Sequence, residues 1–176
     1  MPAFTDKQWI TTDSELKTLL SHCKNCARST MNGDFVLPYN MISYLHVPKG
    51  KFTMVLNTND SHSSNTLGHW FCCHIDNVSR IAILYDSLNE IEFSHPDAVN
   101  EVKMFCKVRN LKLHVLHFKT QESKNVNCGF HSIWFTHKSH ELNPNALLKL
   151  KRLFRSYSVS KREQLIMNNV FTFLKF

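Results

Sequence analysis

The stretch Gln121–Phe135, QESKNVNCGFHSIWF, passes from a polar run to an apolar segment at a single cysteine. Phe130, Ile133 and Trp134 are spaced i, i+3, i+4, which places them on one face of a helix. We therefore predict a buried helix with Cys128 in its first turn. Free backbone N–H groups and the positive end of the helix dipole favour a thiolate there, and the thiolate is the nucleophilic form of cysteine. Cys128 is thus a candidate catalytic nucleophile, and the glycine after it leaves room for a substrate backbone.

Length and composition indicate one domain. The 176 residues, 43% of them hydrophobic, suit a single domain spanning residues 1–176. No apolar run approaches the roughly 20 residues that cross a bilayer, and the N-terminus lacks the basic start and apolar core of a signal peptide. We expect a protein of the nucleus or cytosol that is not secreted and has no membrane partner. Its six cysteines are then expected to be free thiols.

The charge balance is basic. Lys and Arg number 21 against 14 Asp and Glu, which gives a net charge of +7. This excess favours a polyanionic partner, with nucleic acid the first candidate, although a basic protein with no specific partner fits the composition too. The clearest basic run, which is also compatible with a solvated helix face, consists of Lys149, Lys151, Arg152, Arg155, Lys161 and Arg162.

Local signals place helices at both ends of the chain and strands between them. Capping boxes at Thr12–Glu15 and Ser160–Glu163 predict two helix starts, the first helix running to about Arg28. Two more helix starts are predicted where a capping residue precedes a proline: Ser94 before His95-Pro96, and Asn143 before Pro144. The helix that follows Ser94 is predicted to end near Asn110. Phe35 to Gly50 is predicted to be irregular. Strands are predicted at Phe52–Leu56, His69–Ile75, Arg80–Tyr85 and Leu111–Phe118. The order predicts an α+β fold, with a small, mostly antiparallel sheet flanked by helices.

A cysteine nucleophile needs a base to take its proton and an acid to orient that base. Of the 11 histidines, His69 stands out because it follows the turn Thr66-Leu67-Gly68 and opens a buried strand. Its ring is then expected at an open sheet end, where the neighbouring Trp70 could wall the site. A structural or solvent-facing role is the alternative for a histidine in such a position.

The candidate acid is Asp86, the first polar residue after the strand Arg80–Tyr85. Antiparallel neighbouring strands would bring it beside His69, although aspartate at such a position also starts ordinary turns. Asp76 is the rival, but it lies at the far end of the His69 strand, roughly 20 Å away if extended. Gln121 could donate its amide to an oxyanion, together with the backbone N–H of Cys128, or be an ordinary loop residue.

Two further cysteine pairs were weighed as zinc ligands. Cys23 and Cys26 form a CxxC inside a predicted helix, and Cys72 and Cys73 are adjacent strand residues that point to opposite faces. Neither pair matches the paired spacing of a zinc site. We therefore interpret them as buried structural cysteines and expect no metal and no small-molecule cofactor.

Taken in order, these residues resemble a known family. The matching elements are Gly68-His69-Trp70, Tyr85-Asp86-Ser87, Gln121 and Cys128-Gly129. The order resembles the adenovirus protease (adenain) family of cysteine proteases and, more distantly, the SUMO and ubiquitin-like protein proteases, from about Leu16 to about Phe135. The resemblance implies a papain-type site with His69 as base, Asp86 as orienting acid, Cys128 as nucleophile and Gln121 as oxyanion donor.

The resemblance also implies a biological setting. It suggests a thiol endopeptidase of an adenovirus-related virus or virus-like element, which cleaves precursor capsid and core proteins during virion maturation, in the host nucleus and virion. Such an enzyme is expected to be a monomer and to use viral DNA as a cofactor, through the basic run named above.

Some features keep other functions open. Asp86 stands where adenovirus enzymes carry glutamate, and Leu111–Phe118 lacks the cysteine through which those enzymes hold an activating peptide, which leaves the need for one open. One alternative is an isopeptidase of the deubiquitinase or deSUMOylase kind, acting on the narrow Gly-Gly tail of a ubiquitin-like modifier. The other is a basic nucleic-acid-binding protein without enzymatic activity.

Overall fold

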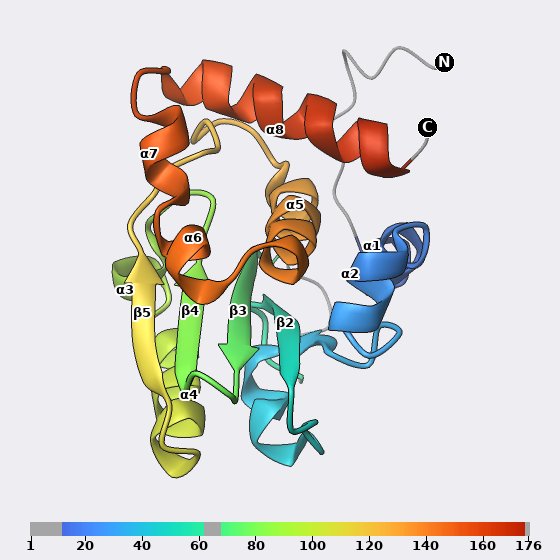
Figure 1. The fold of residues 1–176 in the computed structure, drawn as a ribbon, viewed down its shortest axis with the longest axis vertical. Coiled ribbons are helices and arrows are strands. Elements are labelled where there is room, and N and C mark those ends of the chain that lie inside the picture. Colours follow the sequence, from blue (N-terminus) through green and yellow to red (C-terminus); the bar gives the residue numbers. More distant parts are fainter. Residues whose placement is uncertain (1–11, 62–67, 175–176) are drawn as a thin grey trace.

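The computed structural model, which describes residues 12–61 and 68–174, contains a five-stranded sheet with helices on both faces (Figure 1). The strands lie across the sheet in chain order: β1 (Val36–Pro38), β2 (Lys51–Asn57), β3 (Trp70–Asp76), β4 (Ile81–Tyr85) and β5 (Lys112–Leu116). The central strands β2, β3 and β4 pair antiparallel, whereas β1 and β5 run parallel to their neighbours. The predicted α+β class and mostly antiparallel sheet are confirmed.

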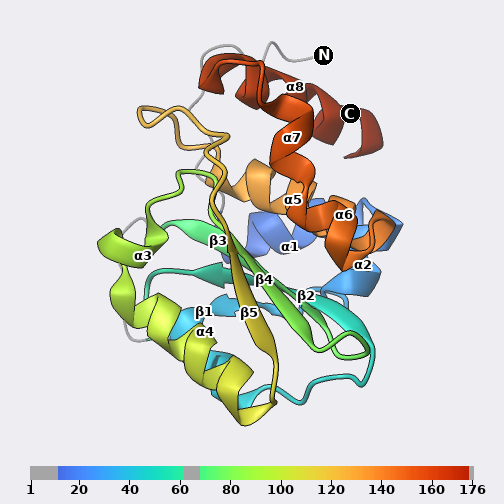
Figure 2. The same ribbon diagram turned by 60° about the vertical axis from the view of Figure 1, so that its left-hand side comes forward.

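Each face of the sheet carries its own hydrophobic cluster. Successive side chains of a strand point to opposite faces, so the adjacent Cys72 and Cys73 of β3 fall in different clusters, as predicted. Helix α5 (Cys128–Glu141) covers one face, and helix α4 (Pro96–Val108) covers the other with the 3₁₀ helix η1 (Tyr39–Tyr44) (Figure 2). The short helix α3 (Ile91–Ser94) contributes Ile91 to the α4 side.

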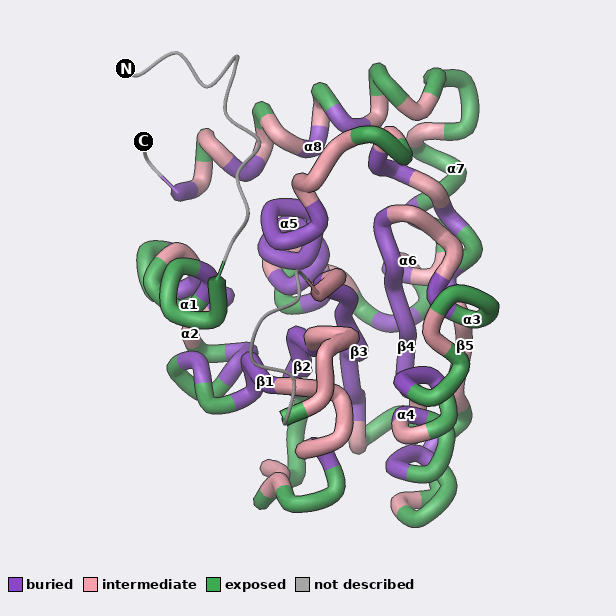
Figure 3. Tube along the Cα trace, turned by 180° about the vertical axis from the view of Figure 1, so that it is seen from behind, coloured by how far each residue is buried: buried purple, intermediate pink, exposed green. Residues whose placement is uncertain are grey.

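The remaining helices pack around α5. They are α1 (Asp13–Ser21), α2 (Lys24–Ser29), α6 (Pro144–Leu148), α7 (Leu150–Phe154) and α8 (Val159–Leu174). Their apolar residues join the α5 cluster, and α8 lies across the end of α5 that is nearer Cys128 (Figure 1). As a result, residues 128–136 are all buried, not only on the predicted apolar face (Figure 3). A helix surrounded on all sides is a rigid support for a site at its first residue. None of the described helices is long and apolar enough to cross a membrane.

The first predicted helix is interrupted. The capping box of Thr12 and Glu15 forms as expected, but α1 ends at Ser21 and a second helix, α2, begins at Lys24. Cys23 is extended between them and caps α2, because its sulfur accepts the Cys26 N–H at 3.4 Å. The CxxC pair therefore does not lie inside one continuous helix.

Three other local predictions were wrong. Ser94 does not cap α4 but ends α3, with its hydroxyl donating to the Glu90 carbonyl, although the proline after it does open α4. The last helix, α8, begins before Ser160, and the hydroxyl of Ser158 accepts the Lys161 N–H instead. The expected irregular segment between Phe35 and Gly50 contains β1 and η1. Thr66 and Leu67 of the predicted turn before His69 lie outside the described residues.

Candidate active site

Cys128 is the first residue of α5, as the apolar spacing predicted. The backbone N–H of Trp70, on β3, points at its sulfur with an N–Sγ distance of 3.5 Å. A hydrogen bond from a neutral donor stabilises a thiolate more than a thiol, so this amide adds to the effect of the helix start. We expected the Trp70 side chain to wall an open site. Instead it is only 2% exposed and packs in the core.

His69 and Asp86 meet at the sheet end that lies beside Cys128. Tyr85 pairs with Cys72 across the antiparallel strands β3 and β4, so the residue after β4 lies near the residue before β3. The distance between His69 Nε2 and Asp86 Oδ1 is 2.5 Å. Asp76 sits at the opposite end of β3, where it caps the turn to β4 by accepting the Val78 and Ser79 N–H groups.

Asp86 is held rigidly as an ionised acceptor. Its carboxylate accepts the backbone N–H groups of Leu88 at 3.1 Å, Glu90 at 2.7 Å and Ile91 at 2.9 Å, in addition to the His69 ring. Burial alone would raise the pKa of Asp86, but the bond and charge of His69 and these N–H groups lower it below its usual value. The same carboxylate therefore starts a turn and orients a histidine.

The neighbours of His69 favour the charged form of its ring. Burial disfavours the imidazolium, but hydrogen bonds to Asp86 and Cys128 outweigh it and raise the pKa of His69 to about 10. Its backbone is fixed to Thr58, whose N–H donates to the His69 carbonyl at 2.9 Å and whose hydroxyl accepts the His69 N–H at 2.8 Å.

Gly68, next to His69, lies against the side chain of Asn57. A Cβ atom at this position would lie 1.8 Å from Oδ1 of Asn57, far inside contact distance. That oxygen accepts the backbone N–H of Asn59 at 2.8 Å, so the Asn57 side chain is itself held in place. The approach of these two segments fixes the path of the chain into His69.

Gln121 is buried, at 1% exposure, in the loop that leads to Cys128. Its Oε1 accepts the Ser87 hydroxyl at 2.7 Å, and its Nε2 donates to the Asn125 carbonyl at 2.5 Å. The Ser87 carbonyl also accepts the Gln121 backbone N–H at 3.0 Å. The bond to Asn125 uses one of the two amide hydrogens of Gln121.

Glu163 of α8, assigned to a capping box from the sequence, instead fixes this loop. Its carboxylate accepts N–H groups from the Glu122 backbone at 3.2 Å, Asn125 at 2.7 Å and Asn127 at 3.1 Å. It also lies 3.5 Å from the buried His131 ring of α5. Burial raises the pKa of Glu163, but these partners lower it below its usual value, so the carboxylate is ionised at neutral pH.

Ser87, Asn125 and Glu163 were not among the residues predicted for the site. Each acts through a bond to a residue at least four positions away, and two of these bonds span more than 30 positions. The only local sign was the charge of Glu163, which interrupts the apolar stripe of Ile166 and Val170 on α8.

The predicted DNA-contact residues lie on the α6 to α8 segment. Arg162 is partly buried and committed to the fold, because its guanidinium donates to the carbonyls of Phe154 at 3.1 Å and Lys119 at 3.0 Å. The other five residues of the basic run are exposed: Lys149, Lys151, Arg152, Arg155 and Lys161. The six cysteines of the chain are free thiols in the structure.

Comparisons with known proteins add the following. No protein-family model matches the chain, and no curated protein matches its sequence. Among solved structures, the chain is similar to the SUMO protease Ulp1 with its catalytic cysteine oxidised to a sulfinic acid, at 15% identity and a TM-score of 0.44, over 94% of this chain and 80% of that one. It is similar to the sulfenic acid form at 14% identity and a TM-score of 0.43, over 93% and 80% of the two chains.

Proposed function

We propose that this protein is a thiol hydrolase that breaks amide bonds. The observation that carries the proposal is the position of His69, whose ring is hydrogen-bonded to the Asp86 carboxylate and whose pKa is raised by Asp86 and by the nearby Cys128 sulfur. The acid orients the base, and the base keeps the nucleophile as a thiolate at the start of a buried helix. A protein that only binds nucleic acid has no need of this arrangement.

In the proposed first half-reaction, the Cys128 thiolate attacks the carbonyl carbon of an amide. The carbonyl oxygen becomes an oxyanion, which we assign to the backbone N–H of Cys128 and the other amide hydrogen of Gln121. The imidazolium of His69 then gives its proton to the leaving nitrogen, the C–N bond breaks, and a thioester remains on the sulfur. Asp86 keeps its charge throughout and stabilises the imidazolium.

In the second half-reaction, neutral His69 removes a proton from water as the water attacks the thioester carbonyl. The same oxyanion donors act again, and the C–S bond breaks to release the carboxylic acid. His69 ends as the imidazolium and Cys128 as the thiolate, which restores the starting pair. The net reaction consumes one water and yields one acid and one amine, so it needs no further reactant.

Within this class we propose an endopeptidase of the adenain type that matures virion precursor proteins. The support is the chain order of the residues: histidine, acid, glutamine and then Cys-Gly at a helix start. The setting in the host nucleus and virion, the monomeric state and stimulation by DNA belong to this proposal. An isopeptidase that acts on ubiquitin-like conjugates would use the same chemical steps and differs only in substrate.

The chemistry is tested with a thiol probe. Iodoacetamide at about pH 6 should label Cys128 at least about tenfold faster than Cys72 and Cys73, which are 0% exposed in the core, because His69 is placed to pair with the Cys128 thiolate. His69→Ala should abolish this preference, whereas His117→Ala, at an exposed ring outside the site, should leave it intact. Peptide mass spectrometry locates the label. Equal labelling of Cys128 with and without His69 would sink the proposal.

The substrate is tested separately. Co-encoded structural proteins and a panel of ubiquitin-like conjugates are incubated with the protein, with and without DNA, and new N-termini are mapped. Cleavage of the structural proteins, lost in Cys128→Ala, is the expected result. Cleavage restricted to the conjugates would keep the thiol hydrolase and replace the maturation role by the isopeptidase.

A further inference from the structure

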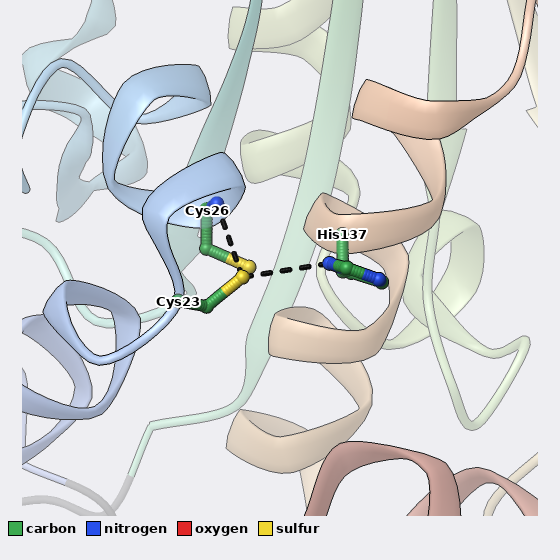
Figure 4. A group of neighbouring side chains, drawn as sticks. All are labelled: Cys23, Cys26 and His137. Atoms are coloured by element: carbon green, nitrogen blue, oxygen red, sulfur yellow. Dashed lines mark hydrogen bonds between the residues drawn. The ribbon is translucent and has the colours of Figure 1, made fainter. Parts of the chain in front are cut away.

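A second group of potential ligands lies at the end of α5 remote from Cys128. Cys23 and Cys26 flank the start of α2, and their sulfur atoms face His137 on α5 (Figure 4). The two sulfurs and a ring nitrogen of His137 all lie within 4.8 Å of one another. Cys23 Sγ is 3.4 Å from His137 Nδ1, although 114 positions separate the two residues.

These distances fit a tetrahedral zinc ion. Zn–S bonds of about 2.3 Å and a Zn–N bond of about 2.0–2.1 Å place a ligand sulfur and nitrogen about 3.5 Å apart. The observed separation of 3.4 Å between Cys23 Sγ and His137 Nδ1 is close to this value. The spacing of Cys23 and Cys26 is the C-x₂-C of zinc sites, and both residues are buried, at 5% and 0% exposure.

The other side of the His137 ring is arranged as in a metal ligand. Its Nε2 lies 2.9 Å from Oε1 of Glu141, one helical turn further along α5. This carboxylate holds the proton on Nε2 and leaves the lone pair of Nδ1 directed at the two sulfurs, which is how metal-binding histidines are commonly oriented. Phe173 of α8 stacks on the ring, with centroids 4.1 Å apart. The orientation of the ring is thus fixed from two sides.

We propose that Cys23, Cys26 and His137 bind one Zn²⁺ ion, with water as the fourth ligand and Glu141 as the outer partner of the histidine. The ion joins α2 to α5, the helix that presents Cys128 nine residues earlier. Its role is structural, because roughly 13 Å of helix separates it from the catalytic sulfur.

This proposal revises the expectation of no metal. That expectation rested on a CxxC placed inside a continuous helix and on the lack of a second cysteine pair. Cys23 instead lies in the break between α1 and α2, and the third ligand is a histidine of α5 that no local spacing could reveal.

Metal content is measured on the full chain carrying Cys128→Ala, so that the catalytic thiol and its histidine do not add a site. The chain is expressed in medium containing zinc, freed of any affinity tag and purified without chelator. Mass spectrometry of the metal should find about one zinc per chain. His137→Gln and Cys23→Ser should each lower this to below about 0.2. The matched control His140→Gln, whose ring contacts Ser29 of the same α2 helix, should retain the metal.

A second measurement does not depend on these variants. Cobalt(II) added to the metal-free chain should give the charge-transfer band of two thiolate ligands in the near ultraviolet and the visible bands of a tetrahedral site. Zinc should raise the Tm by roughly 5–10 °C. A chain without zinc, without cobalt bands and with both thiols free would overturn the proposal, and so would a disulfide between Cys23 and Cys26.

Discussion

Asp86 shows how one side chain can have two roles that the sequence presents as alternatives. It starts the turn after β4, since its backbone carbonyl accepts the Asn89 N–H, and it also holds the His69 ring. The turn supplies the N–H groups that keep the carboxylate ionised. The local role is therefore what prepares Asp86 for the role we assign to it in catalysis.

Asp86→Asn should reduce kcat by about 10²-fold and narrow the pH profile. The carboxylate raises the pKa of His69, which is about 10 in the folded protein. Its removal lowers that pKa, so the ion pair with Cys128 is lost at lower pH and the alkaline limb of activity moves down. Profiles of kcat/KM between pH 5 and 10 measure the shift. Asp76→Asn, at the other end of β3, is the control and should leave the alkaline limb in place.

Gly68→Ala should lower kcat by about tenfold or more with a smaller change in KM, because it moves the base more than the substrate. The added methyl group overlaps the present position of the Asn57 side chain, so it displaces either that side chain, which is held by the Asn59 N–H, or the chain that enters His69. The double variant with Asn57→Gly provides the room and should recover part of the activity. Unchanged kinetics in Gly68→Ala would show that the path into His69 tolerates the shift.

At the scale of elements, α8 determines the shape of the loop before Cys128. Glu163 is the acceptor for three N–H groups of that loop, and the loop carries Gln121. The helix that closes the fold at one end of α5 is thus connected to the proposed oxyanion donor. This gives the C-terminal helix a positioning role in addition to its share of the core.

Glu163→Gln should lower kcat while leaving the alkylation of Cys128 nearly unchanged, whereas most variants would affect both. Loss of the charge weakens the bonds to Asn125 and Asn127 and releases the Gln121 loop, so kcat should fall by about tenfold. The rate of Cys128 alkylation should hardly change, because Trp70, His69 and the helix start still hold the thiolate. Gln164→Ala, the exposed neighbour on α8, is the control. A parallel fall in alkylation and kcat would indicate general loosening and contradict a specific role for the loop.

The elements that could be predicted were those specified by nearby residues. The starts of α5 and α6 follow from apolar spacing and from the cap of Asn143, which accepts the Ala146 N–H at 2.9 Å. His69 and Asp86 were found because strand ends in an antiparallel hairpin must meet. The contact of Cys23 with His137 and the direction of Glu163 join residues 114 and more than 35 positions apart. No local pattern encodes such contacts, so these features could not be predicted.

At the scale of the whole molecule, acid should unfold the protein partly through His74. Its ring is buried between the sheet and α5, where Thr53 Oγ1 lies 3.0 Å from Nδ1. Burial lowers the pKa of His74 to about 4, whereas the unfolded value is about 6.5. The contribution of neutral His74 to the free energy of unfolding is therefore fully present above about pH 6.5. It decreases at lower pH, because His74 takes up a proton in the unfolded chain while it stays neutral in the folded chain.

Between pH 6.5 and 4.5, this single group should lower the free energy of unfolding by roughly 2–3 kcal/mol. Urea titrations at several pH values measure the slope. His74→Gln cannot take up a proton, so its slope over this interval should be flatter, even though its stability at pH 7 is lower. An unchanged slope would assign the acid sensitivity to other groups.

At the surface of the molecule, we predict that the basic run binds DNA. Five of its six residues are exposed, while Arg162 is committed to carbonyls of the fold. Replacing Lys149, Lys151 and Arg152 by Gln should weaken binding to a labelled duplex. It should also reduce the slope of log K against log salt by up to about 2.7, since each lost phosphate contact contributes about 0.9.

The control removes the same charge elsewhere. Lys103, Lys107 and Lys112 are also exposed but lie on α4 and β5, and their replacement by Gln gives the chain an identical net charge. Fluorescence anisotropy from low to physiological salt compares the two triple variants. If the α6–α7 residues touch phosphates, only the first variant loses slope. Equal losses of slope in the two variants would mean that DNA binding depends on the net charge of +7 and not on a particular face. The α6–α8 segment would then have no special claim to be the DNA site.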